Sequence, residues 1–190
     1  MWPLLKEHIE KHVALTDEEF EKVCSFLTFR RYRRKQFILQ EGDISRYESF
    51  ILKGCCRIYD TDSEGHEHVL QFGVEGWWVG DLYSYLTQTP SSCNIDCIED
   101  CETVQLTLLQ QEALYKAVPL MERFFRIIIQ NAFIASQRRV LHNMSKSGAE
   151  RYKDFIEKYP HIEQRVPDRQ VASYLGLTPQ SLSRIRARKR

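Results

Sequence analysis

Residues 165–186 read RVPDRQVASYLGLTPQSLSRIR, and this stretch decides the fold of the C-terminal part of the chain. Asp168 is expected to cap a short helix, and Gly176 ends it. Three apolar positions of that helix are expected to face inward: Val171, Ala172 and Leu175. Thr178 followed by Pro179 is typical of the start of a second helix. Two short helices joined by such a turn predict a helix-turn-helix.

The second helix of this motif carries polar and basic side chains of the kind that enter a DNA major groove. Gln180 is suited to pair with adenine and Arg184 with guanine, while hydroxyls at the helix start are suited to phosphate oxygens. The residues predicted to contact DNA are Thr178, Pro179, Gln180, Ser181, Ser183, Arg184, Arg186, Arg188 and, in the first helix, Arg169. The basic tail that ends at Arg190 adds charge directed at phosphates. A helical hairpin that serves only protein contacts is the alternative.

Acidic and basic residues are unevenly divided between the N-terminal and C-terminal parts of the chain. Residues 1–137 contain 14 Lys and Arg against 21 Asp and Glu, a net charge of −7, whereas residues 138–190 contain 13 against 5, a net charge of +8. An acidic body with a basic C-terminal segment is a common footprint of a nucleic-acid-binding module attached to a second domain. A solvated basic surface without a nucleic-acid partner would give the same balance, so the charge supports the motif and does not replace it.

The N-terminal part of the chain predicts two short helices followed by a β-roll. Apolar residues have helical spacing over 3–28, and Thr16 with Glu19 forms a capping-box pattern. From Arg31 to about Leu109 the chain has short runs of β-branched and aromatic residues. Glycines separate these runs, Gly80 among them, at positions where tight turns are expected to need a positive φ. The fold class predicted is α+β, with an antiparallel β-roll, or jelly roll, before a helical C-terminal part.

A long helix is predicted between these parts, because Leu120 to Ser147 contains neither glycine nor proline. Its apolar set is wider than the single stripe that would cover the roll. The second face is predicted to join two copies of the chain as a homodimer, through Phe124, Ile127, Ile128, Asn131 and Ile134. One broad buried face on an ordinary core helix is the alternative reading.

In this order, the parts resemble the Crp/Fnr family of transcription factors over nearly the whole chain. Four segments are similar to the cyclic-nucleotide-binding roll of that family: Glu41–Asp43, Leu52–Arg57, Asp62–Gly65 and Gly76–Asp81. The resemblance implies three parts: a roll with N-terminal helices over 1–118, a dimerisation helix over 119–147, and a winged-helix-type DNA-binding domain over 148–190 with its wing missing or truncated. It also implies double-stranded palindromic promoter DNA and RNA polymerase as partners, and a non-enzymatic role. A cytoplasmic location is expected because Met1–Leu5 leads into Lys6, Glu7 and His8 and not into a secretory core. No apolar run approaches the ~20 residues of a membrane span, and no membrane partner is expected.

The chain departs from that family at the nucleotide site. The family uses a glycine and a glutamate at the start of a short helix, then an Arg-Ser pair that neutralises the cyclic phosphate. Here the corresponding residues are Gly80, Asp81, Leu82, Ser91 and Ser92. Because Ser91 replaces the arginine, a charge-assisted contact of about 1.5–3 kcal/mol is lost, and cyclic AMP is not expected to bind in the usual way. No cofactor is assigned, and a small-molecule effector of other chemistry is left open.

Two alternatives rest on cysteines and histidines. Cys93, Cys97 and Cys101 recur every four residues, which leaves open a redox- or metal-responsive regulator. Small buried residues in a reducing cytosol are the simpler explanation of all six cysteines. The segment His66-Glu67-His68, with Glu75 as the nearest later acid, imitates the first metal motif of a cupin metalloenzyme. His142 and His161 lie in the helical part, so exposed hairpin histidines are favoured and no metal site is assigned.

Overall fold

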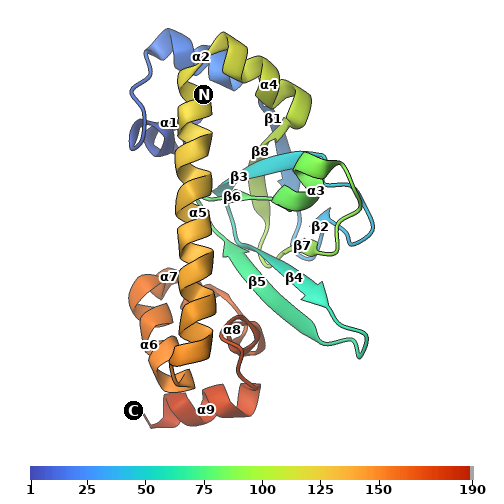
Figure 1. Ribbon diagram of the computed structural model, residues 1–190, viewed down its shortest axis with the longest axis vertical. Helices are drawn as coiled ribbons and strands as arrows, with labels where there is room; N and C mark the ends of the chain where they lie inside the picture. Colours follow the sequence, from blue (N-terminus) through green and yellow to red (C-terminus); the bar gives the residue numbers. More distant parts are fainter. Residues whose placement is uncertain (189–190) are drawn as a thin grey trace.

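The computed structural model describes residues 1–188, so Lys189 and Arg190 of the predicted basic tail lie outside the described residues. Figure 1 shows one long helix beside a β-roll, with short helices at both ends of that helix. The helices are α1 (Pro3–Glu10), α2 (Asp17–Ser25), α3 (Leu82–Thr87), α4 (Leu108–Ala117), α5 (Leu120–Ser145), α6 (Gly148–Lys158), α7 (Pro160–Arg165), α8 (Asp168–Tyr174) and α9 (Pro179–Ala187). The strands are β1 (Thr28–Tyr32), β2 (Phe37–Leu39), β3 (Tyr47–Lys53), β4 (Cys56–Thr61), β5 (Glu67–Gly73), β6 (Trp78–Val79), β7 (Asn94–Cys97) and β8 (Cys101–Thr107).

Two four-stranded antiparallel sheets make the roll. One has the order β1-β8-β3-β6 and the other the order β2-β7-β4-β5. Apolar side chains of both sheets meet between them, with Ile51 on β3 and Ile95 on β7 fully buried. Because side chains alternate along a strand, Phe50 of β3 points to the opposite face. The predicted α+β fold with an antiparallel roll is confirmed.

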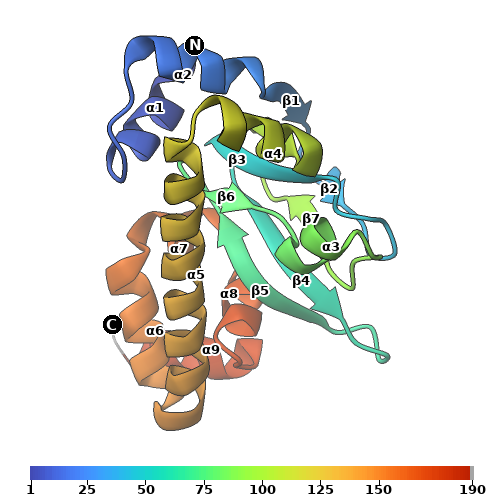
Figure 2. The ribbon, with the colours of Figure 1, turned by 45° about the horizontal axis from the view of Figure 1, so that its top comes forward.

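Helices cover that opposite face of the first sheet. The two predicted N-terminal helices are present as α1 and α2, and Thr16 with Glu19 closes the capping box at the start of α2. Phe20 of α2 and Phe124 of α5 join the cluster that packs on Phe50. Figure 2 shows α1, α2 and α4 gathered around the N-terminal end of α5. None of the described helices is both long enough and apolar enough to cross a membrane.

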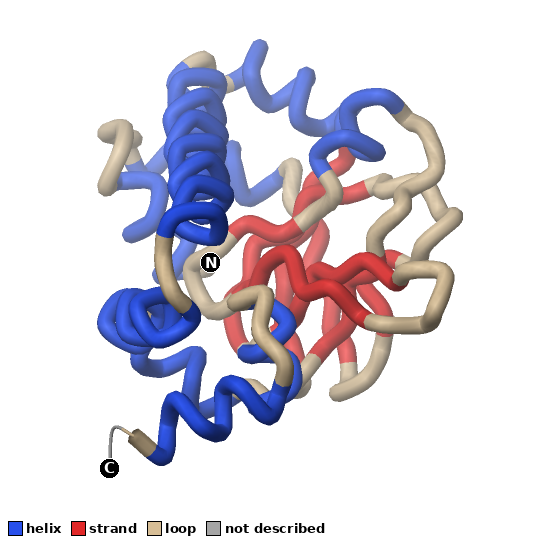
Figure 3. Tube along the Cα trace, turned by 60° about the horizontal axis from the view of Figure 1, so that its bottom comes forward, coloured by secondary structure: helices blue, strands red, loops and turns tan. Residues whose placement is uncertain are grey.

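The C-terminal helices are docked onto the roll. A second buried cluster contains Phe72 of β5 together with Phe155 of α6 and Val171 of α8. Tyr174 at the end of α8 lies 5.2 Å, between ring centroids, from Phe72. Figure 3, with helices in blue and strands in red, shows these helices lying against one end of the roll. The helix-turn-helix and the roll therefore share a hydrophobic core.

Candidate nucleic-acid interface and effector site

The predicted helix-turn-helix is present as α8 and α9. Gly176 has a φ of +63°, a conformation that favours glycine, and it ends α8 where the sequence predicts. The Thr178 hydroxyl accepts a hydrogen bond of 3.2 Å from the Ser181 backbone N–H, so Thr178 caps α9, and Pro179 occupies its first turn. The inward positions are buried as expected: Val171, Ala172, Leu175 and Leu182.

One side of α9 is open to solvent. Arg184 is exposed, and its Nε donates to the Gln180 carbonyl, 3.4 Å away on the same helix. Ser181 is half-buried and lies 2.9 Å from the Thr178 hydroxyl. Six other residues of the predicted DNA-contacting set are exposed: Arg169, Thr178, Pro179, Gln180, Ser183 and Arg188. We call the exposed residues Thr178, Pro179, Gln180, Ser183 and Arg184, together with the half-buried Ser181, the α9 face.

Arg186 and Asp168 form ion pairs within their own domain. Arg186 turns toward its own domain, where it pairs with Glu163 at 2.5 Å and donates to the Tyr152 hydroxyl at 3.0 Å. Asp168 pairs with Arg186 at 2.5 Å and caps nothing by its side chain. The prediction that Asp168 caps a helix is therefore wrong, whereas Arg186 as a DNA contact stays a prediction for a side chain that is engaged within its own domain. The reason is that both side chains find opposite charges within the domain, which spacing along the sequence does not reveal.

The predicted effector site centres on Asp81, at the start of α3. Its carboxylate accepts hydrogen bonds from the backbone N–H groups of Tyr83 and Ser84, at 3.1 and 3.3 Å, and from the Ser91 hydroxyl at 2.7 Å. The backbone donors that would cradle a phosphate thus already bind an internal carboxylate. A phosphate that approached them would be repelled by Asp81 instead of meeting a cation.

Gly80 has no side chain, and this leaves room for the Glu48 carboxyl in the predicted effector site. Its φ is not positive, which corrects the expected tight turn, but a Cβ at this position would lie 2.4 Å from the Glu48 Oε1. That oxygen is buried and has no hydrogen-bond partner among residues 1–188. Burial, and then the neighbouring Asp81 carboxylate, raise the pKa of Glu48 to about 8. Leu82 and Ser92 are exposed, so the structure brings together Gly80, Asp81 and Ser91 but not the whole predicted set.

The predicted dimerisation face of α5 is only partly available. Phe124 is fully buried, because α1 packs on it and places the His8 ring 5.6 Å from its ring centroid, so the prediction that it faces a partner is wrong. Ile127 and Ile128 are half-buried, whereas Asn131 and Ile134 are exposed.

The exposed apolar face of α5 extends further toward the C-terminus than the sequence analysis proposed. Leu141 follows Ile134 by seven residues, and the two are 61% and 49% exposed. The other large apolar side chains exposed there are Ile129, Phe133, Val140 and Met144. The heptad spacing from Ile134 to Leu141 was the sequence signal for this extension.

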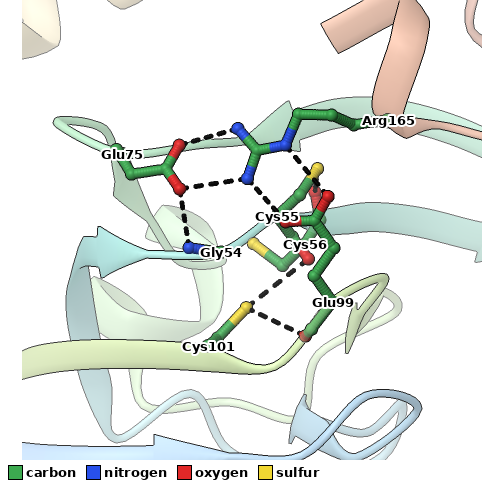
Figure 4. A network of polar contacts seen from close by, with 7 residues as sticks. All are labelled: Gly54, Cys55, Cys56, Glu75, Glu99, Cys101 and Arg165. Carbon is green, nitrogen blue, oxygen red and sulfur yellow. Dashed lines mark hydrogen bonds and ion pairs between the residues drawn. The ribbon is translucent and has the colours of Figure 1, made fainter. Parts of the chain in front are cut away.

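Arg165, which was not among the residues predicted to be functional, links the C-terminal helices to the roll. Figure 4 shows Arg165, at the end of α7, between Glu75 and Glu99 of the roll. Arg165 donates to Glu75 at 2.7 and 3.0 Å and to Glu99 at 2.6 and 2.9 Å. Glu75 also accepts from the Gly54 backbone N–H at 2.8 Å. These charge-assisted bonds fix one end of the C-terminal helices against the roll.

A second link holds α8 itself. The Ser173 hydroxyl donates to the Glu67 carbonyl at 2.7 Å and accepts from the Val69 backbone N–H at 2.9 Å, so α8 continues the hydrogen bonding of β5. Arg139 of α5 donates to the Leu70 carbonyl, and its guanidinium lies 5.1 Å from the Tyr174 ring centroid. The first helix of the motif is therefore fixed to β5, while the α9 face remains open.

All six cysteines are free thiols, five of them in the roll and Cys24 on α2. Burial raises the pKa of Cys93, and the hydrogen bond with Cys101, then burial, raise the pKa of Cys97. The same Cys97–Cys101 hydrogen bond lowers the pKa of Cys101. Cys101 also donates to the carbonyls of Cys55 and Glu99, at 3.4 Å each. Packing and hydrogen bonding account for these residues, so the redox- or metal-responsive alternative is not favoured.

The histidines that imitate a cupin motif lie on the hairpin between β4 and β5. His68 contacts Asp62 at 2.8 Å, while Glu67 pairs with Arg57 and Glu75 with Arg165. His66 and His68 are exposed, as expected of hairpin histidines. Among residues 1–188 there is no group of three or more histidine, cysteine or acidic side chains arranged to hold a metal ion.

Comparisons with known proteins agree with this geometry. The cyclic nucleotide-binding domain family matches residues 29–117. FixK2 from Bradyrhizobium japonicum superimposes with a TM-score of 0.74 at 18% identity, over 85% of this chain and 83% of that one. The regulator CLP of Xanthomonas campestris, described as c-di-GMP responsive, gives 0.74 at 13% identity over 91% of both chains. The Thermus thermophilus catabolite activator protein gives 0.62 at 19% identity, over 95% of this chain and 85% of that one.

A search of curated protein sequences found no significant match. These three structures are less than 20% identical to the chain and therefore show the fold. They extend across the roll, the long helix and the C-terminal helices, beyond the segment matched by the domain family. Residues 29–117 therefore match the cyclic nucleotide-binding domain family, and the chain shares its overall fold with FixK2, CLP and the Thermus thermophilus catabolite activator protein.

Proposed function

We propose that the chain is a DNA-binding transcription regulator that acts as a homodimer on palindromic promoter sites. The observation that carries this proposal is the α9 face, where Gln180, Ser183 and Arg184 are exposed on a capped helix. A helix presented in this way can enter the major groove and hydrogen-bond to base edges. Arg169 and Arg188 lie exposed nearby and supply contacts to phosphates.

The homodimer is supported by the exposed apolar face of α5. Ile134, Leu141 and Met144 are 49%, 61% and 83% exposed, and a single chain leaves them in water. A parallel pair of α5 helices would bury them and present two copies of the α9 face to DNA. Two-fold symmetry would match half-sites spaced about one helical turn apart. Activation or repression would then follow from contact with RNA polymerase.

The roll acts in this proposal as a regulatory domain that does not bind cyclic AMP in the usual way. Asp81 occupies the donors at the start of α3, and Ser91 stands where the family has a cation. Arg165 and Ser173 connect the roll directly to the helices that carry the α9 face. A change in the roll would therefore alter operator affinity through these contacts.

Selection from random duplex DNA tests the proposal. The full chain is expected to enrich a palindrome, and its solution mass is expected to equal two chains. Affinity for the selected site should fall steeply as salt rises, because phosphate contacts release counterions. Failure to enrich any sequence, or a mass of one chain at the concentration used for binding, would contradict it.

A further inference from the structure

A groove opens between the two sheets of the roll, on the side where their edge strands β1 and β2 lie. One part of it has a volume of about 340 Å³ and the other about 700 Å³. Both parts are lined by Phe37, Gln40 and Tyr47, and we call the two together the edge groove. Figures 1 and 2 show β2 and the turn that follows it on the side of the roll away from α5. The edge groove is therefore separate from the predicted dimerisation face.

The smaller part of the edge groove is mainly apolar and reaches the core of the roll. Leu39 and Ile95 line it and belong to the buried cluster between the sheets. Ile44, Phe37 and Tyr47 line it too, and all three are exposed although they are large and apolar or aromatic. Exposed apolar side chains gathered on one concave surface are typical of a binding site. This part of the groove is suited to an alkyl chain.

The larger part is polar. Ile51 of β3 points between the sheets, so Ser49, two residues earlier, points the same way. Gln105 of β8 lies opposite Ser49 and lines the groove. Its side-chain amide donates to the Ser49 hydroxyl at 3.0 Å and to the Tyr32 hydroxyl at 2.8 Å. Because Tyr32 accepts this bond, its own hydroxyl proton is available to an acceptor in the groove, and within residues 1–188 that proton has none.

The rim of the edge groove is cationic. Against a single acid, Asp43, its lining contains four basic residues: Arg30, Arg31, Lys35 and Arg46. Arg31 pairs with Glu102 at 3.2 Å, whereas the other three have no ion pair within residues 1–188. Arg30 lies opposite Thr103 on β8, and Thr103 lies opposite Ile51, so Arg30 is on the face that points between the sheets. An unpaired cation beside the Tyr32 donor favours an anionic group.

The backbone holds Lys35 at this rim. Lys35 has a φ of +70°, a left-handed conformation that is uncommon for residues other than glycine. Its backbone N–H donates to the Cys97 carbonyl at 2.7 Å, and the Gln36 side chain accepts from the Arg33 backbone N–H at 2.6 Å. These bonds fix the turn between β1 and β2, so the charge of Lys35 stays at the polar end of the groove.

We propose that the edge groove binds the anion of a medium-chain fatty acid. Its carboxylate would lie at Arg30, Lys35 and the Tyr32 hydroxyl, and its alkyl chain against Leu39 and Ile44. Charge complementarity selects the head group, and the apolar part selects the chain. An acidic peptide would meet the cations but leave the apolar part empty. The proposal goes beyond DNA binding and does not depend on it, because the lining contains no residue of α5 or of the α9 face.

Calorimetry on the full chain without DNA tests the site, with octanoate as the probe. Hexanoate is shorter by two methylenes and is expected to bind about five- to fifteenfold more weakly, because each buried methylene contributes to affinity. 1-Octanol lacks the charge and octylammonium reverses it, so each is expected to bind at least about tenfold more weakly than octanoate.

Two pairs of variants separate the two ends of the groove. Arg30→Glu should weaken octanoate binding by at least about tenfold. Arg33→Glu is its matched control, since Arg33 is exposed on the same segment but does not line the groove, and it should change affinity by less than about twofold. Ile44→Gln should weaken octanoate binding by about fivefold and reduce the difference between octanoate and hexanoate. Leu86→Gln, at an exposed apolar position of α3 outside the groove, should leave both unchanged.

Several results would overturn the proposal. These are no binding of octanoate at millimolar concentration, equal binding of hexanoate or 1-octanol, and equal losses in Arg30→Glu and Arg33→Glu. If hexaglutamate binds as tightly as octanoate and Ile44→Gln weakens neither, the rim is a contact for acidic protein segments and the proposal is wrong. Because these titrations contain no DNA, the fatty-acid site can stand where DNA selection fails, and the reverse is equally visible.

Discussion

The α9 face and the site around Asp81 are two surfaces that the sequence marks in the same way, by a capping residue at the start of a short helix. At α9 the cap, Thr178, bonds within its own helix and leaves Gln180 and Arg184 facing solvent. At α3 the cap is charged, and Asp81 draws in Ser91 as well as two backbone donors. A capped helix start of this kind therefore remains open to a ligand only where its polar side chains are not already hydrogen-bonded to other parts of the protein.

The largest effect on stability and DNA binding is expected from a substitution in the buried core beneath the α9 face. Leu182 is 1% exposed, so Leu182→Ala should lower the free energy of unfolding by about 2–5 kcal/mol and abolish DNA binding. Thermal unfolding and DNA titration measure both changes. Leu109→Ala is the control, because Leu109 is 84% exposed and its loss should be nearly neutral. Equal effects of the two substitutions would show that α9 is not held in this way.

Next in size is the contribution of the open side chains. Arg184→Ala should cost about 1–3 kcal/mol of discrimination at one position of each half-site while leaving thermal stability nearly unchanged. Arg186→Ala should do the opposite, because Arg186 is engaged with Glu163, Asp168 and Tyr152. Repeating the DNA selection and the thermal unfolding with both variants distinguishes them. An altered base preference in Arg186→Ala would mean that this side chain leaves its ion pairs to read DNA.

The site around Asp81 is expected to make the stability of the chain depend on pH through Glu48. Its pKa is raised to about 8, above the value of an unfolded glutamate, so the folded state binds more protons than the unfolded state between these values. Stability should therefore fall as pH rises from 5 to 8, by at most about 1.4 kcal/mol per pH unit from this group. Glu48→Gln should remove this component, measured as the difference between the two unfolding curves. A difference that does not vary with pH would contradict the buried, uncharged carboxyl.

The smallest effect is expected at the cap of α3. Asp81→Ala should lower stability by about 0.5–2 kcal/mol, the usual range for losing an N-cap. Asp43→Ala, on an exposed loop nearby, serves as the control and should be close to neutral. If Asp81→Ala instead leaves stability unchanged, Asp81 does not satisfy the donors at the start of α3.

Local signals in the sequence were enough to predict the parts of the fold. Gly176, Thr178 and Pro179 each impose a backbone geometry on their own position, and the turn formed as predicted. The capping box of Thr16 and Glu19 formed for the same reason. The errors concern residues whose role depends on distant partners. Phe124 is covered by α1, whereas Asp168 is exposed and pairs with Arg186, and nothing within a few residues of either indicates that contact.

The candidate site, like the fold, was predictable where the signal is local in the sequence and not where it depends on distant residues. The exposed members of the α9 face follow from helix periodicity, whereas Arg165 was missed because its two acids lie 90 and 66 residues away. The replacement of the family's arginine by Ser91 was visible in the sequence, but the hydrogen bond from Ser91 to Asp81 was not.

The cluster that joins Phe72 of β5 to Phe155 and Tyr174 has a thermodynamic consequence. Separating the roll from the C-terminal helices would transfer these rings into water, at a free-energy cost of roughly 25 cal/mol for each Å² of apolar surface exposed. The roll and the C-terminal helices are therefore expected to unfold together, and a calorimetric scan should show one cooperative transition in place of two. A fragment ending before α6 would carry an exposed aromatic patch on β5 and should self-associate where the intact protein does not.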